Sequence, residues 1–151
     1  DFYDLRMVLT TEIIGTRTSL GVLGYFYEQN VFPRTITSPR PAWVAANEGD
    51  PFNPDERQRD GVPVLKYKRP VTDDDKKAEH LMTVVTGTGY NFRLSLGDSV
   101  WMIWSVGSNN TNDGAKYVQN TSKRVTGADY IIWPPLESLT RQHLKDTDAL
   151  K

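Results

Sequence analysis

The chain contains no cysteine and only two histidines among its 151 residues. The absence of cysteine excludes disulfides, thiol nucleophiles, iron–sulfur clusters and zinc fingers, and it leaves the redox compartment open. The two histidines, His80 and His143, stand in no HExxH-type spacing, and the chain has no G-x-S-x-G nucleophile elbow. We therefore predict no catalytic residue. We expect His80 at the surface, and we expect His143 either packed against the fold or snorkelling with its polar ring tip in water.

An excess of either sign of charge is also missing. The 18 basic residues stand against 19 acidic ones, for a formal net charge of -1. A dedicated nucleic-acid-binding domain normally carries a basic excess, so nucleic acid is not expected as a partner. No apolar run approaches the roughly 20 residues needed to cross a bilayer. We therefore expect a soluble chain without a membrane span.

What the sequence does contain is a series of short segments, rich in β-branched and aromatic residues and separated by Gly, Pro and Asn. Such segments predict strands. They are residues 5–14, 20–32, 64–68, 80–86, 90–96, 100–106, 117–125 and 129–133. Residues 20–32 also fit a helical face, but two glycines and three adjacent aromatics favour a strand there. A short helix is predicted over 73–80, and Pro134-Pro135 starts another over 135–146.

This order of elements predicts a mainly β fold: an antiparallel β-sandwich, jelly-roll-like, with a short C-terminal helix. We expect one domain over residues 1–134 and a C-terminal helix and tail over 135–151. Residues 33–63 hold six of the nine prolines and form a long irregular loop. A loop of that length in a compact domain is usually functional or mobile.

Two predicted strands, 100–104 and 130–133, are apolar on both faces and therefore need cover on two sides. The chain's own helix at 135–146 or the long loop supplies that cover in one interpretation. In a second, other copies of the chain supply it, since Trp and Tyr are enriched in interface hot spots. In a third, the aromatics form a stacking platform for sugars or bases. The second interpretation predicts an oligomer interface of Trp101, Ile103, Trp104, Tyr130, Ile132 and Trp133.

Weaker candidates for a ligand site come from exposed aromatics and from acidic residues. Trp43, Tyr67 and Tyr117 are candidate sugar-binding side chains in a lectin-like alternative. Asp50, Asn53 and Asp55 offer hard oxygen ligands at short spacing, which is compatible with a Ca²⁺ site as the one cofactor considered. A pair of carboxylates would be needed for the remaining alternative, a small carboxylate-dependent hydrolase.

The segment FRLSLGDSVWMIW (92–104) resembles the strand–Gly-Asp–strand pattern of trimeric jelly rolls of the C1q/tumour-necrosis-factor type, and GADYIIWPP (127–135) stands for their last strand. The chain is also similar to jelly-roll domains of virus capsid and spike proteins in its Asn/Thr/Gly loops and proline-rich connectors. The resemblance implies self-assembly and surface recognition, with no catalytic residue. We therefore expect a non-enzymatic domain of a virus capsid or similar assembly, at a virion or extracellular surface. Its partners would be other copies of itself and a host-surface receptor or glycan.

Overall fold

The first 29 residues form a helix rather than strands. The computed structural model describes residues 2–45, 48–53, 64–70, 80–85, 91–96, 100–119 and 128–148. Helix α1 (Phe2–Gln29) is 28 residues long and replaces the strands predicted over 5–14 and 20–32. Its threonines fit a helix because their hydroxyls donate to carbonyls one turn back. Thr11 Oγ1 lies 2.8 Å from the Met7 oxygen, and Thr18 Oγ1 lies 2.8 Å from the Ile14 oxygen.

Six short strands form two separate three-stranded sheets. The first sheet has the order β1 (Lys66–Lys68), β4 (Met102–Ser105), β6 (Tyr130–Trp133), and both of its pairings are antiparallel. The second has the order β3 (Asn91–Leu96), β2 (His80–Val85), β5 (Tyr117–Gln119). In this second sheet β2 pairs antiparallel with β3 but parallel with β5.

The prediction of a mainly β, jelly-roll-like sandwich is therefore wrong. The 28-residue α1 and the 11-residue α2 (Leu136–Asp146) contain more residues than the strands, each of which has three to six. The strands predicted over 64–68, 80–86, 90–96, 100–106 and 129–133 are confirmed in position, and so is the helix over 135–146. Of the strand predicted over 117–125, the structure has 117–119 as β5. The helix predicted over 73–80 falls outside the described residues, except that His80 begins β2.

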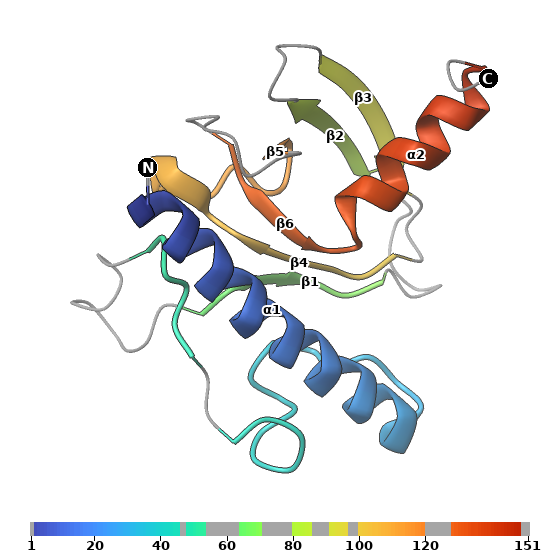
Figure 1. Cartoon of the computed structure of the whole chain (residues 1–151). Helices are drawn as coiled ribbons and strands as arrows, with labels where there is room; N and C mark the ends of the chain where they lie inside the picture. The colour runs from blue at the N-terminus through green and yellow to red at the C-terminus, as the bar shows by residue number, and fades with distance from the viewer. Residues whose placement is uncertain are drawn as a thin grey trace.

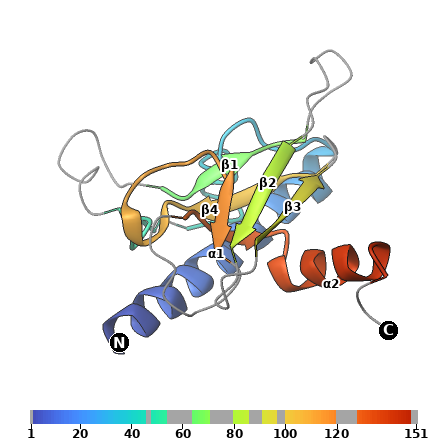
Figure 2. The ribbon, with the colours of Figure 1, turned by 90° about the horizontal axis from the view of Figure 1, so that it is seen from above.

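The layers are arranged as α1, the first sheet, and then the second sheet with α2 (Figures 1 and 2). One apolar cluster lies between α1 and the first sheet, and it contains Ile14, Val22, Trp101 and Ile103. A second cluster joins the two sheets and α2, and it includes Met82, Met102, Trp104 and Leu136. Strand β4 thus stands in the middle of the molecule with a core on each side.

Glycines let other segments of the chain approach the backbone of α1 closely. A Cβ at Gly15 would overlap Ile132, and a Cβ at Gly21 would overlap Val44. These glycines disfavour the helix in isolation by about 1 kcal/mol each relative to alanine. Packing against the bare backbone offsets that cost. Among the described residues, no helix combines the length and the apolar character needed to span a membrane.

Candidate functional site

Trp101, just before β4, and Trp104 within it belong to the interior of the chain. Trp101 is 6% exposed, Trp104 is 7% exposed and Ile103 is fully buried. Trp101 stacks on Trp133 with the ring centroids 5.1 Å apart, and Trp104 Nε1 donates to Asn112 Oδ1 at 3.1 Å. The second apolar face of this strand, which one interpretation of the sequence gives to another copy and another to the chain's own C-terminal helix or long loop, is covered by α1 of the same chain. These side chains therefore leave β4 no exposed surface for a second copy.

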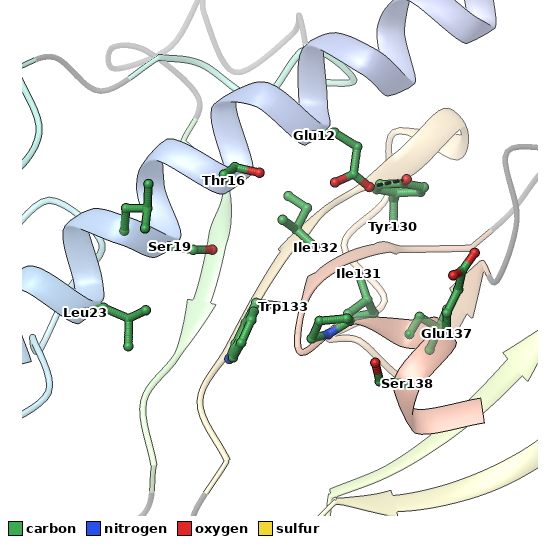
Figure 3. Close-up of a pocket in the computed structure, with 13 residues that line it drawn as sticks. Glu12, Thr16, Ser19, Leu23, Tyr130, Ile131, Ile132, Trp133, Glu137 and Ser138 are labelled. Atoms are coloured by element: carbon green, nitrogen blue, oxygen red, sulfur yellow. Dashed lines mark hydrogen bonds between the residues drawn. The ribbon is translucent and has the colours of Figure 1, made fainter. Parts of the chain in front are cut away.

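The three predicted interface residues of β6 are half-buried and line a groove beside α1. This groove has a volume of about 590 Å³ and runs between α1 on one side and β6 with the start of α2 on the other (Figure 3). The apolar part of its lining includes Ile132, Trp133 and Leu23. A volume of several hundred Å³ is typical of small-molecule sites. The groove thus brings together three residues that the sequence singles out and several that it does not.

Polar groups gather at one end of this groove. The Tyr130 hydroxyl donates a hydrogen bond to Glu12 Oε1, across the gap between β6 and α1 (Figure 3). Burial raises the pKa of Tyr130 above its usual range, and Glu12 and Glu137 raise it further because a phenolate would be repelled by both carboxylates. Tyr130 therefore remains a neutral donor. The groove holds two carboxylates, and none of its described lining residues is basic.

Ser19 is the one buried polar side chain of the described residues that lacks a hydrogen-bond partner. The residue is 8% exposed, and Figure 3 shows its hydroxyl directed from α1 into the groove. A buried polar group without a partner costs roughly 1–3 kcal/mol. Serine would usually turn its hydroxyl to a carbonyl one turn back, as Thr18 does. Ser19 instead offers a free hydroxyl to the groove.

The outward face of α1 carries a continuous apolar stripe. Its members are spaced three or four residues apart, except where Thr16 stands between two of them, and so fall on one side of a helix. They are Phe2, Leu5, Leu9, Ile13, Leu20, Leu23 and Tyr27, which we call the outer stripe. Phe2 is 85% exposed and Tyr27 is 89% exposed. Buried residues such as Thr11, Ile14 and Val22 occupy the opposite face, so α1 is apolar on both sides.

A second, smaller groove lies on the other side of the outer stripe. Its volume is about 400 Å³, and its lining includes Trp43, Val44 and the ion pair between Arg17 and Glu48, whose atoms lie 2.6 Å apart. Leu20 lines both grooves and forms the ridge between them. The loop that follows α1 therefore shapes the surface beside the helix.

Of the three predicted Ca²⁺ ligands, the structure describes Asp50 and Asn53, and it places Asp50 among hydrogen-bond donors of the chain itself. Asp50 is fully buried, and its carboxylate accepts hydrogen bonds from Ser105 Oγ at 2.7 Å and from the backbone N–H groups of Val106 and Phe52, each at 3.0 Å. Its oxygens are thus engaged by protein donors. Asn53 is buried in the same turn, and Asp55 lies outside the described residues. Within the described ranges, no group of three His, Asp or Glu side chains is placed to hold a metal ion.

Asp129 is a second fully buried aspartate, and it holds the loop that precedes β5. Its carboxylate accepts hydrogen bonds from the backbone N–H of Ala115 at 2.7 Å and of Asp113 at 3.2 Å. Burial raises the pKa of Asp129 to about 6, although these two N–H groups oppose the rise. Burial also raises the pKa of Asp50, against the hydrogen bonds from Ser105, Val106 and Phe52. Both aspartates act as anchors for loops rather than as surface groups.

The three candidate sugar-binding aromatics do not lie together as one platform. Trp43 is 45% exposed, but its ring covers Gly24 of α1 and its Nε1 donates to Glu28 Oε2 at 3.0 Å. Tyr67 is half-buried, and its hydroxyl donates to the Pro33 carbonyl at 3.0 Å. Tyr117 is exposed on β5, in the other sheet.

The histidines are placed as packing or strand residues. His143 stacks on Phe92 with ring centroids 4.6 Å apart, which confirms the prediction of a packed histidine on the C-terminal helix. His80 begins β2, and its side chain lies outside what the structure describes.

The outer stripe and the larger groove are the features that stand out on this surface, and sequence reasoning missed both. The signal was present in the spacing of Leu5, Leu9 and Ile13, but it was hidden because Met7 and Val8 between them are apolar too. No protein family, curated protein or solved structure matches this chain. Its function therefore has to be inferred from these side chains.

Proposed function

We propose that the chain is a non-enzymatic assembly subunit that associates with other copies of itself through the outer stripe of α1. The observation that supports this is the row of seven exposed apolar side chains on the face of α1 opposite its buried face. A soluble monomer rarely exposes contiguous apolar patches larger than a few hundred Å². Covering the stripe would remove its apolar surface from water, which stabilises the complex by roughly 25 cal/mol per Å² before the cost of association is subtracted.

The stripe is large enough for a specific interface. An aromatic side chain presents about 150–250 Å², so Phe2 and Tyr27 alone contribute a few hundred Å². Five Leu and Ile side chains, 41–62% exposed, add to this area. The sum is on the scale of the roughly 800 Å² per partner that a standard interface buries.

A second copy fits this surface because it supplies a helix of the same length and period. A 28-residue helix is about 42 Å long, and a partner must match it over that length to cover the stripe. The distribution of charge also favours one relative orientation of the two helices. In the N-terminal half of α1, Glu12 lies on one side of the stripe and Arg6 lies on the other, whereas Arg17 is already paired with Glu48. Two parallel helices bring the acidic side of one against the basic side of the other, but antiparallel helices bring like charges together.

The first test measures molar mass by light scattering over a range of concentrations. The wild-type chain should form an oligomer, and Leu9→Glu should dissociate it, because a carboxylate would be buried in an apolar contact. Tyr117→Glu is the matched control, since it also places a charge at an exposed apolar position, but on β5. A wild-type chain that stays monomeric up to its solubility limit would disprove the proposal, as would equal effects of the two variants.

The second test uses the absence of cysteine to determine orientation. With parallel helices, a single Leu5→Cys variant should form a disulfide with Leu5→Cys of the other copy. With antiparallel helices Leu5 would lie near Leu23 of the other copy, roughly 27 Å from its Leu5, and only a mixture of Leu5→Cys and Leu23→Cys would cross-link. Efficient cross-linking in the mixture alone would contradict the parallel arrangement.

The proposal keeps self-association from the sequence analysis but moves it from the predicted interface over 101–104 and 130–133 to α1. The jelly roll that connected the chain to capsid proteins is not the fold observed, so a capsid is not part of the proposal, and neither is a virion or extracellular location. The lectin-like alternative is not proposed because Trp43, Tyr67 and Tyr117 do not share one platform.

A further inference from the structure

We infer that the larger groove between α1 and β6–α2 is a binding site for an organic cation: a primary ammonium or guanidinium group carried on an apolar stem. The groove shares Leu20 and Leu23 with the outer stripe, but the proposal does not depend on self-association. Three features carry it: the charge at one end of the groove, the free hydroxyl of Ser19, and the apolar wall opposite.

The charge of the groove is negative. Glu12 on α1 and Glu137 in the first turn of α2 stand on opposite sides of Tyr130, and both oppose its ionisation. No described lining residue carries a positive charge. The N-terminus of α2 also borders the groove and carries a dipole charge of roughly +0.5. Two full carboxylate charges outweigh it, so the polar end attracts a cation.

Ser19 provides an independent indication of a ligand. Its hydroxyl is more than nine-tenths buried, has no partner among the described residues and points into the groove. An oxygen of this kind accepts a hydrogen bond from an N–H donor. Glu12 has a second carboxylate oxygen besides the one that Tyr130 engages, and Thr16 adds another hydroxyl on the same face of α1. Thr16 lies one helical turn from Glu12 and one turn from Ser19, so an ammonium group seated at Thr16 can also donate to the nearer of these two acceptors.

The apolar lining of the groove provides a contact surface for the apolar stem of the ligand. Trp133 stacks on Trp101, so the indole that borders the groove is held in a fixed orientation. Leu23 and Ile132 extend this surface on either side. An aromatic ring also attracts a cation placed over its face. The groove therefore selects a cation with an apolar body over a simple inorganic cation.

The test compares ligands that share a stem but differ in charge. Hexylammonium, hexanol and hexanoate are titrated into the full chain while the indole N–H resonance of Trp133 is followed by NMR, with Trp133→Phe used to assign that resonance. Hexylammonium should shift the signal at the lowest concentration, and hexanoate should not bind. Equal binding of hexanol and hexylammonium would overturn the proposal, as would no binding of any of the three.

Variants then test the named groups. Glu12→Gln keeps an acceptor for Tyr130 but removes the charge, and it should weaken hexylammonium binding about tenfold, the worth of one charge-assisted hydrogen bond. Glu137→Gln should weaken it about threefold, because an exposed carboxylate is screened by water. Asp148→Asn removes an equal charge from an exposed position near the end of the described chain and should change nothing. If the Glu12→Gln and Asp148→Asn variants bind hexylammonium equally well, the cation does not bind at Glu12 and the proposal is overturned.

Ser19→Ala separates a ligand-binding role from a structural one. Since the Ser19 hydroxyl has no partner in the fold, alanine should raise the melting temperature while it weakens hexylammonium binding about threefold. A variant that is both less stable and weaker in binding would show a structural hydroxyl and overturn its assigned role. A capped Leu-Lys-Leu peptide, titrated in parallel, distinguishes the sources of the cation. Tighter binding than hexylammonium points to a polypeptide, and weaker binding points to a free amine.

A negative result in these binding experiments can be told apart from a negative result in the self-association experiments. Leu5 and Leu9 lie outside the groove lining, whereas Glu12, Ser19 and Glu137 lie outside the outer stripe. The hexylammonium titration is repeated with the Leu9→Glu variant, which is expected to be monomeric. A second copy then cannot cover the groove and prevent binding.

Discussion

Ile132 packs against the bare backbone of α1 at Gly15, where a Cβ would overlap the Ile132 side chain. This contact sets the distance between helix and sheet. One turn away, Glu12 meets Tyr130, and toward the C-terminus of α1 the larger groove opens between Ser19 and Trp133. Glycine is unfavourable inside a helix, so its presence at this contact reflects close packing rather than chain flexibility.

Gly15→Ala is therefore expected to destabilise the fold. Inserting a methyl group into a packed contact costs about 1–3 kcal/mol, and the better helix propensity of alanine recovers about 1 kcal/mol of that. We expect a net loss of about 1–2 kcal/mol in the free energy of unfolding, measured with urea. Thr16→Ala, at an exposed neighbouring position, should instead stabilise slightly. A Gly15→Ala chain as stable as the wild type would show that Ile132 does not pack this closely.

Trp101→Ala tests whether the tryptophan just before β4 serves the core or an interface. Trp101 lies between Phe32 and Trp133, with centroid distances of 6.2 Å and 5.1 Å. Truncating a buried tryptophan costs about 3–5 kcal/mol. Trp43→Ala, which removes a half-exposed ring, should cost far less in the same urea experiment. A stable Trp101→Ala chain with an altered oligomeric state would instead restore this residue to an interface.

Ser105→Ala tests the anchor of the turn at Asp50. The Ser105 hydroxyl donates to Asp50 and accepts from the Gly107 N–H at 3.1 Å. Alanine would leave a buried carboxylate oxygen short of a donor and a buried N–H without an acceptor, at a cost of about 1–3 kcal/mol for each group. Ser108→Ala, at an exposed position of the same turn, is the control and should be neutral. Equal stability of the two variants would contradict the network.

The sequence predicts the strands well where one residue in two is apolar, because that period belongs to strands alone. In β3, Phe92 and Leu94 alternate with polar neighbours, and the observed strand matches. Helix α1 was missed for the opposite reason. Its outer stripe adds apolar residues opposite the buried face, so the helical period is lost. Its glycines count against a helix locally, yet each is a contact with Ile132, Val44 or Trp43 that only tertiary structure reveals.

The candidate site was predicted in part. The sequence correctly indicates that β4 needs cover on both faces, and that Trp101 and Ile103 share one of them. It does not indicate which segment provides the cover, since that depends on a helix about 80 residues earlier in the chain. Glu12 and Tyr130 are likewise 118 residues apart, and no local pattern relates two such residues.

The pH dependence of stability should show the burial of Asp129. Burial raises the pKa of Asp129 to about 6 in the folded chain, from 3.8 for the free side chain. Between these two values the folded state binds more protons than the unfolded state, so the free energy of unfolding falls as pH rises. The contribution is fully present below about pH 4 and is lost as pH rises through about 6; it amounts to at most about 3 kcal/mol. Asp50 acts in the same direction, because burial raises its pKa as well.

Asp129→Asn isolates this effect, since an amide does not titrate. The variant is expected to be less stable than the wild type at about pH 4.5, where the protonated carboxyl is well accommodated, and the difference should shrink toward about pH 7.5. One reason for the loss at low pH is that an amide nitrogen cannot accept the hydrogen bond from Asp113 or Ala115. Asp148→Asn, which removes an exposed carboxylate, should follow the wild-type curve across this range. Urea unfolding at several pH values measures all three chains. If the difference between Asp129→Asn and the wild type stays constant with pH, then Asp129 titrates normally and the loop it holds is more open to water than its burial indicates.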